Sequence, residues 1–218
     1  MSNPSTPGRP TTGSSAPRLI GLASHAAQSG KSTVARTLIA SEGFSSVPLA
    51  APLKRMVTEF LWELGTMSEG QIAYAVYVDR STVVPGLGVT TRHLLQTLGT
   101  EWGRQCVCPD VWLRCWSAAA EDLLAAGRSV VVDDVRFPDE ADFIRERGGE
   151  LWLIDRGLEA DTNHASEGGL RGYPHFSCHI NNKGVSLEEL QEAVLTALSL
   201  SGTVHTSQVE NTSTGDQA

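Results

Sequence analysis

The chain lacks any run of about 20 apolar residues, the length that would cross a membrane. Its first 17 residues and its last 18, 201–218, are dominated by small and polar residues, and neither end contains the apolar stretch of a signal peptide. Such segments bury too little surface to offset the entropy of ordering, so we expect disordered tails around one folded domain at 18–200. We therefore expect a soluble protein of the cytoplasm.

Lysine is scarce, because arginine supplies 14 of the 17 basic residues and the net charge is -8. An acidic chain without a basic stripe argues against duplex DNA or RNA as the main partner. Single arginines spread along the chain suit small phosphorylated ligands, whose oxygens a guanidinium grips in pairs. The four cysteines form no pair of C-x-x-C elements, which argues against a zinc site.

What the chain does contain is a strand, a small-residue loop and a helix in succession. Residues 19–23 are apolar, and residues 31–40 have helical spacing after the sequence Gly30-Lys31-Ser32. This order predicts a phosphate-binding loop, in which Lys31 reaches the outer phosphates and the Ser32 hydroxyl binds Mg²⁺. The backbone N–H groups expected to hold the phosphates belong to Gln28, Ser29, Gly30, Lys31, Ser32 and Thr33. His25 stands where the usual pattern has glycine, which affects how the chain enters the loop.

The segment 129–134 predicts a central strand that ends in Asp133 and Asp134. Ligands of open parallel sheets bind beyond the carboxyl ends of the strands, so one of these acids is expected to hold Mg²⁺ through water or to accept a proton. Arg136 follows at the same edge and can reach an anionic substrate. The competing interpretation is that these acids only cap a helix.

Two helices are expected to supply further substrate contacts. Pro52 begins the first, which ends at Gly65 and carries Lys54 beside its positive end, where a cation is unfavourable unless an anion binds it. The second spans 90–104 and carries Arg92 and Gln96, whose amide could contact a base edge. A solvated lysine and a surface glutamine are the alternatives.

The remaining pattern completes an α/β domain. We expect short strands at 46–50, 150–155 and 176–180, a helix capped by Asp110, and a terminal helix opened by Ser186. Residues 157–174 form a polar, glycine-rich loop with the length of a mobile lid. The segment 66–89 fits no regular pattern and is interpreted as an insertion that covers substrate.

Several blocks resemble the phage-type deoxynucleoside monophosphate kinases. They are residues 94–103 (LLQTLGTEWG), 134–138 (DVRFP), 51–54 (APLK), His164-x-Ser166-Glu167 and Ile180-x-Asn182. The resemblance implies a P-loop kinase fold with three layers, a central parallel sheet flanked by helices, a lid from about 156 to 174 and a helical insertion on the substrate side. It also implies transfer of the γ-phosphoryl group of ATP to a deoxynucleoside monophosphate, for phage DNA synthesis in an infected bacterium.

The same resemblance suggests roles for single residues. The catalytic group would be Lys31, Asp134, Arg136 and the lid arginine Arg156, with Mg²⁺ held by Ser32 and Asp134. Arg136 would grip the acceptor monophosphate, and the other substrate-side residues would be Lys54, Arg92, Gln96 and Trp102.

Two alternatives remain open at this stage. One is a kinase of the same fold that acts on a modified deoxynucleotide, on hydroxymethylated bases in DNA or on dephospho-coenzyme A. The other is a nucleotide-binding switch that transfers nothing. The sequence leaves the preferred base and the oligomeric state, including a homodimer, undetermined.

Overall fold

Five parallel strands form one sheet at the centre of the computed structural model, which describes residues 16–26, 28–158 and 169–206, with side chains to residue 201. Along the sheet the strand order is β2-β3-β1-β4-β5. The strands are β1 (Leu19–Ala23), β2 (Ser45–Ser46), β3 (Val130–Val132), β4 (Glu150–Asp155) and β5 (Cys178–Asn181). The connection from β1 runs toward one edge of the sheet, to β2, whereas the connection from β3 runs toward the opposite edge, to β4. The two connections therefore diverge beside the carboxyl end of β1, and open α/β sheets bind ligands at such a point.

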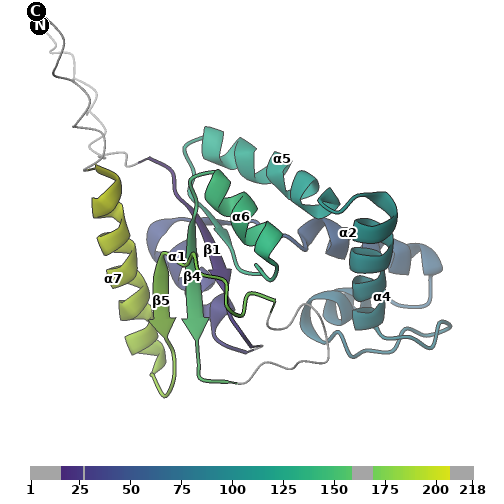
Figure 1. Ribbon diagram of the computed structural model, residues 1–218. Helices are drawn as coiled ribbons and strands as arrows, with labels where there is room; N and C mark the ends of the chain where they lie inside the picture. Colours follow the sequence, from purple (N-terminus) through teal and green to yellow (C-terminus); the bar gives the residue numbers. More distant parts are fainter. Residues whose placement is uncertain (1–15, 27, 159–168, 207–218) are drawn as a thin grey trace, which may run out of the picture.

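Helices cover both faces of this sheet (Figure 1). Alternate residues of the strands enter different cores: Leu19 packs with α5 (Val111–Ala125) and α6 (Pro138–Glu146), whereas Ile20 packs with α1 (Lys31–Glu42) and α7 (Leu187–Thr206). Strands buried on both faces read as continuous apolar runs, as β1 and β3 do here. The predicted three-layer α/β fold with a parallel sheet is confirmed.

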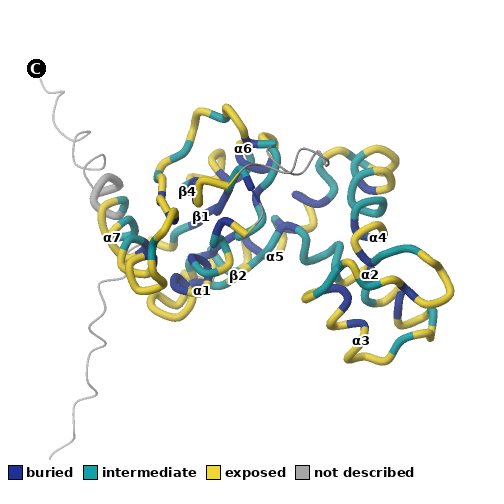
Figure 2. Tube along the Cα trace, turned by 90° about the horizontal axis from the view of Figure 1, so that it is seen from below, coloured by how far each residue is buried: buried dark blue, intermediate teal, exposed yellow. Residues whose placement is uncertain are grey.

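The predicted helical insertion is also present, between β2 and β3. It contains α2 (Ala51–Leu64), α3 (Glu69–Ala73), the π-helix η1 (Tyr74–Val78), α4 (Thr91–Thr97) and a second π-helix, η2 (Leu98–Val107). These elements lie to one side of the sheet (Figure 2) and share a small core of their own that includes Val57, Leu61 and Ile72. The segment 66–89, which had no assignment from sequence, supplies α3, η1 and a turn closed by an isolated bridge from Val83 to Thr90.

Some features of the elements differ from those expected from the sequence. The strand expected at 46–50 is only Ser45–Ser46, and the chain leaves the sheet at Pro48, which has no N–H for the ladder. Asp110 precedes α5 but does not cap it; its carboxylate instead accepts hydrogen bonds from Arg114 and Cys108. The capping box of Ser186 with Glu189 is confirmed.

The terminal helix continues to Thr206, beyond the boundary expected at residue 200. In the described ranges, no helix is both long and apolar enough to span a membrane.

Candidate active site

The loop between β1 and α1 leaves the positive end of a helix open. Gly30 caps α1 with φ 105°, which glycine adopts without strain, and no side chain of the described residues makes a capping hydrogen bond. The first turn of α1 contains no acidic residue. Since the chain does not itself neutralise the partial charge at this end, the loop suits a phosphate.

Asn182, which follows β5, holds the loop between β1 and α1 through a hydrogen bond. Its Nδ2 donates a hydrogen bond of 2.8 Å to the carbonyl oxygen of Ser29, and the side chain is buried. A Cβ on Gly30 would collide with the same amide nitrogen. Position 30 therefore needs glycine both for its φ angle and for the close approach of Asn182.

Lys31 folds back across the loop and donates a hydrogen bond to Ser24 Oγ, which in turn donates to the carbonyl oxygen of Ala26 (2.8 Å). Ser32 is exposed at the start of α1, as a metal-binding hydroxyl would have to be. Of the amides expected to face the phosphates, that of Thr33 is already engaged, because it donates to the carbonyl of Gly30 at 2.9 Å.

Two polar atoms of this loop are buried without a hydrogen-bond partner among the described residues, His25 Nδ1 and Ser29 Oγ. Buried polar groups are nearly always paired. Arg156, the expected lid arginine, lies against the same loop, where its Nη1 donates to the carbonyl oxygen of Gln28 at 3.1 Å.

The two carboxylates after β3 have different surroundings. Both oxygens of Asp134 accept backbone hydrogen bonds, from Leu49 N–H (2.7 Å) and Ala50 N–H (3.0 Å). Asp134 thus fixes the start of α2, and its expected role as a metal ligand stays a prediction.

Asp133 lies among charges from both sides of the site. Burial raises the pKa of its carboxyl, with a further contribution from Asp134, while the positive charges of Lys54 and Lys31 oppose the increase. The carboxylate therefore lies within electrostatic reach of the phosphate-loop lysine and of a lysine on the insertion.

Four basic side chains, Lys54, Arg80, Arg92 and Arg136, form what we call the cation cluster: the charges of Asp133 and Asp134 act on Lys54 and Arg80, Arg136 acts on both of these, and Arg92 acts on Arg80. Burial lowers the pKa of Lys54, and the charge of Arg80 lowers it further. The pKa of Arg80 is lowered by burial, then by Arg136 and Arg92. Like charges that depress one another's pKa favour binding of an anion, because an anion relieves their repulsion.

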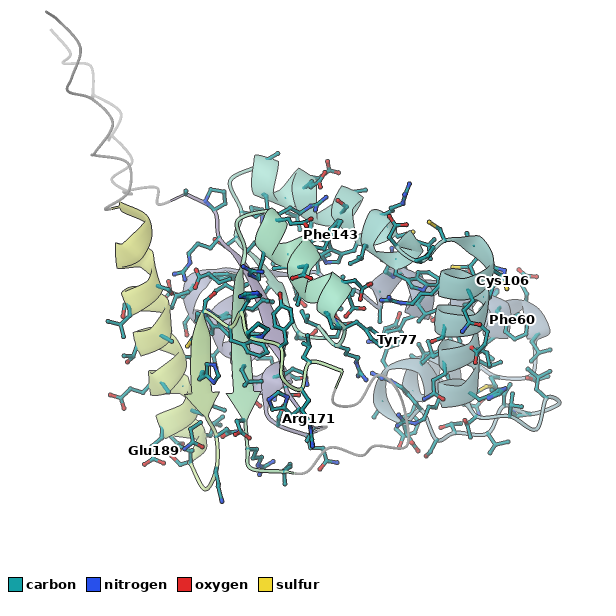
Figure 3. All side chains as sticks on the ribbon, in the orientation of Figure 1. Phe60, Tyr77, Cys106, Phe143, Arg171 and Glu189 are labelled. Atoms are coloured by element: carbon teal, nitrogen blue, oxygen red, sulfur yellow. The ribbon has the colours of Figure 1, made fainter. Side chains whose placement is uncertain are left out.

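The insertion supplies three members of this cluster, Lys54, Arg80 and Arg92. Lys54 comes from the first turn of α2, as expected, and its Nζ lies 5.7 Å from the centre of the Tyr77 ring. Tyr77 itself lies between the sheet and α4 (Figure 3). Among the residues expected from sequence, the charge of Arg136 acts on Lys54, whereas Arg92 is linked to them through Arg80; their contacts with substrate stay a prediction.

Arg80 is the cluster member that sequence reasoning missed. It falls in the unassigned segment, where no periodicity indicated which side chains face inward. Its backbone carbonyl accepts a hydrogen bond of 2.8 Å from Arg92 N–H, which places the two arginines side by side. A lone arginine between the aspartate and serine of a polar turn was the only available signal.

Gln96 and Trp102 have no hydrogen bond to the cation cluster among the described residues. Gln96 is half-buried on α4, and Trp102 is exposed on η2, with its ring centroid 6.3 Å from that of Trp112. Their substrate contacts stay a prediction.

The expected lid can be followed only in part. His164, Ser166 and Glu167 lie outside the described residues. At the end of the segment, Leu170 is buried in the core shared with α6, and the Tyr173 hydroxyl donates to Asp142 at 2.6 Å. Leu170 and Tyr173 are therefore docked against α6.

Mg²⁺ held jointly by protein and nucleotide oxygens fits this set of residues, since a cluster of protein ligands is not required for it. Within the ranges 16–26, 28–158 and 169–206, no group of three or more His, Cys, Asp or Glu side chains is arranged to hold a metal by itself. Ser32 is exposed at the helix start, and Asp133 is the carboxylate on which the charges of both Lys54 and Lys31 act.

Comparison with known proteins gives three similarities. Residues 86–194 match the family model "Deoxynucleotide monophosphate kinase". A protein of Acanthamoeba polyphaga mimivirus named "Putative deoxynucleotide monophosphate kinase" is 34% identical over 182 residues, which cover 78% of this chain and 91% of the viral protein. Among solved structures, a sugar kinase from a Janibacter species aligns with a TM-score of 0.41 and 17% identity over 86% of this chain and 98% of its own, a similarity too distant to bear on function.

Proposed function

Since this chain belongs to the deoxynucleotide monophosphate kinase family, we propose that it transfers the γ-phosphoryl group of ATP to a deoxynucleoside monophosphate. One observation carries the proposal. The charges of Lys31, beside the loop before α1, and of Lys54, on the insertion, both act on the Asp133 carboxyl, which supports a common centre for the two sides. Phosphoryl transfer needs this arrangement, with a donor phosphate and an acceptor phosphate meeting in line.

On the donor side, the open end of α1 and Lys31 would hold the outer phosphates of ATP. Catalysis of this reaction consists mostly of positioning and of neutralising charge on the transferred group. Lys31 would leave Ser24 to reach the phosphates, and Arg156 would turn from Gln28 toward the transferred group. The buried Nδ1 of His25 and hydroxyl of Ser29 are further polar groups available to this side.

On the acceptor side, the cation cluster would bind the monophosphate of the acceptor. Arg136 and Arg80 can each form paired hydrogen bonds with phosphate oxygens, whereas Lys54 contributes a point charge. Gln96 and Trp102 are proposed to contact the deoxynucleoside.

Mg²⁺ would be held by the ATP phosphates, by the Ser32 hydroxyl and, through water, by Asp133, and it would neutralise charge on the phosphates. We assign the carboxylate role to Asp133 in place of Asp134, because Asp134 already accepts two backbone hydrogen bonds. Closure of the segment after Arg156 would exclude water, which otherwise hydrolyses ATP.

The proposal places the reaction in the cytoplasm of a phage-infected bacterium, where the diphosphates would supply DNA synthesis. The preferred base is the open part of this proposal.

A panel of deoxynucleoside monophosphates tests the proposed function. ADP release from ATP and Mg²⁺ should depend on particular members of the panel and should fall at least a hundredfold in Lys31→Ala, as expected when a charged phosphate contact is removed from a transition state. Absence of stimulation by every member would contradict the proposal and would favour a modified deoxynucleotide, dephospho-coenzyme A or a nucleotide switch.

A further inference from the structure

A partly buried ion pair joins the insertion to the turn that carries Arg136. Arg104, on η2, donates from Nη2 to Glu140 Oε1 at 2.7 Å and from Nη1 to Asp139 Oδ2 at 2.7 Å. Its guanidinium carbon lies 4.6 Å from the centre of the Phe137 ring. Three contacts thus fix one arginine of the insertion to the start of α6.

The second oxygen of Glu140 faces the other way. Oε2 accepts hydrogen bonds from the backbone N–H groups of Arg136 (2.8 Å) and Phe137 (3.1 Å). Glu140 is only 7% exposed, so its carboxylate depends on these partners in place of water. A single side chain therefore connects an arginine of the insertion to the backbone of Arg136.

This connection matters because the cation cluster comes from two parts of the molecule. Lys54, Arg80 and Arg92 belong to the insertion, whereas Arg136 follows β3 of the sheet. The insertion has a small core of its own, separate from the cores on the two faces of the sheet. A phosphate gripped from both sides needs the distance between them to be fixed.

We propose that Arg104 and Glu140 are positioning residues for the acceptor: they hold Arg136 at the distance from the insertion that binding of the acceptor monophosphate requires. This inference rests on the proposed function. Neither side chain touches the reacting atoms, since both are occupied by each other, by Asp139 and by backbone groups.

The test compares Arg104→Met, Glu140→Gln and the double variant with Arg147→Met. Arg147 is a matched control, because it also pairs with a carboxylate (Glu121, 3.1 Å) and lies over a phenylalanine (Phe143, 3.5 Å), but at the far end of α6. The measurements are kcat, KM for the deoxynucleotide, KM for ATP, and calorimetric binding of the same deoxynucleotide.

Arg104→Met should raise the acceptor KM and the calorimetric Kd about tenfold or more, the effect of a lost hydrogen bond to a charged group, with the KM for ATP within about twofold of wild type. The double variant should recover part of the loss, because the amide oxygen introduced by Glu140→Gln can still accept from both backbone groups and no buried charge remains. Arg147→Met should leave both KM values unchanged.

Equal rises in both KM values, or a lower melting temperature with unchanged acceptor binding, would overturn the positioning role. The proposed function fails separately. If the wild type binds the deoxynucleotide but does not phosphorylate it, the kinase proposal is contradicted, while weaker binding by Arg104→Met would still support the positioning role. If the wild type binds no deoxynucleotide, both are overturned.

Discussion

Two carboxylates follow β3, and they differ in their interaction partners. Asp134 accepts from Leu49 and Ala50 and so holds the start of the helix that bears Lys54. The charges of Lys54 and Lys31 act on the Asp133 carboxyl and oppose the increase in its pKa. From sequence both are acids at a strand end, and only the partners in three dimensions distinguish the carboxylate that binds the backbone from the one proposed to serve the reaction.

Asp134→Asn should therefore act on stability. The asparagine carbonyl can accept from one of the two N–H groups, and the other is left without an acceptor, which costs about 1–3 kcal/mol in the free energy of unfolding. Urea denaturation measures this loss. The Mg²⁺ concentration for half-maximal activity should stay within about twofold of wild type, because a hydrogen bond and no metal contact is lost.

Asp133→Asn is the counterpart and should raise that Mg²⁺ concentration about tenfold or more, as loss of an outer-shell partner typically does. A larger Mg²⁺ requirement in the Asp134 variant than in the Asp133 variant would reverse the two assignments.

Arg80 gives a prediction that the sequence alone could not supply. Arg80→Met should raise the KM for the deoxynucleotide about tenfold or more, because a charge-assisted contact to phosphate contributes about 1.5–3 kcal/mol. Steady-state kinetics with either substrate varied measures the effect. Arg114→Met, which removes an exposed arginine paired with Asp110, is the control and should leave the KM unchanged; an equal effect in the control would contradict a specific role for Arg80.

Helix α1 has a glycine in the left-handed backbone conformation at each end, and the two glycines have different roles. Gly30 (φ 105°) lies in the phosphate loop against Asn182, whereas Gly43 (φ 69°) ends the helix with open space around it. Gly30→Ala adds steric conflict to backbone strain and should abolish measurable ATP binding. Gly43→Ala should only lower the free energy of unfolding, by about 1–2 kcal/mol.

Calorimetric titration with ATP, beside denaturation of each variant, separates these effects. Wild-type ATP affinity in Gly30→Ala would contradict the assignment of this loop as the donor site.

The start of α6 predicts a pH dependence of stability. Burial raises the pKa of Glu140 to about 7, although the backbone N–H of Arg136 and the charge of Arg104 oppose the shift. The native state then binds a proton that the unfolded state, with a carboxyl pKa near 4.5, releases. The contribution to stability is present below pH 4.5 and is lost as the pH rises through about 7.

The loss amounts to roughly 3 kcal/mol in the free energy of unfolding. Glu140→Gln cannot titrate, so its stability relative to wild type should rise between pH 5 and pH 8, within the window that linkage predicts. A difference that is constant over this range would contradict the raised pKa.

Helices and strands were predicted correctly where one hydrophobic pattern extends over the whole segment. Residues 150–155 were expected as a strand and form β4, and the expected strand, loop and helix at 19–40 are present as β1 and α1. The π-helices were missed, since residues 98–107 have a helix-like pattern that does not show the wider turn. The β2 strand was expected to extend to residue 50, yet the last hydrogen bond to β3 comes from Val47 N–H, and Leu49 lies beyond the strand with its side chain in the core.

The molecule as a whole has two separately packed regions: the sheet with its helices, which has a core on each face, and the insertion, which has a core of its own. The sheet and its helices carry the phosphate loop, and the insertion has a separate core that includes Leu61 and Ile72. Leu61→Ala should lower the free energy of unfolding of the insertion by about 2–5 kcal/mol. Acceptor binding should weaken while ATP binding persists; hydrogen exchange should show loosening of α2 and α4 with β1 and β3 protected. Loss of protection throughout would show that the two regions unfold as one unit.

Transfer of a labelled phosphoryl group is the decisive measurement for the kinase proposal. ATP labelled at the γ-phosphate is incubated with Mg²⁺, the enzyme and a deoxynucleoside monophosphate, and the products are separated. We expect the label to appear in a deoxynucleoside diphosphate, at a rate that falls at least a hundredfold in Lys31→Ala. Label found only in inorganic phosphate, or retained in ATP with every deoxynucleotide tried, would contradict the proposed phosphoryl transfer.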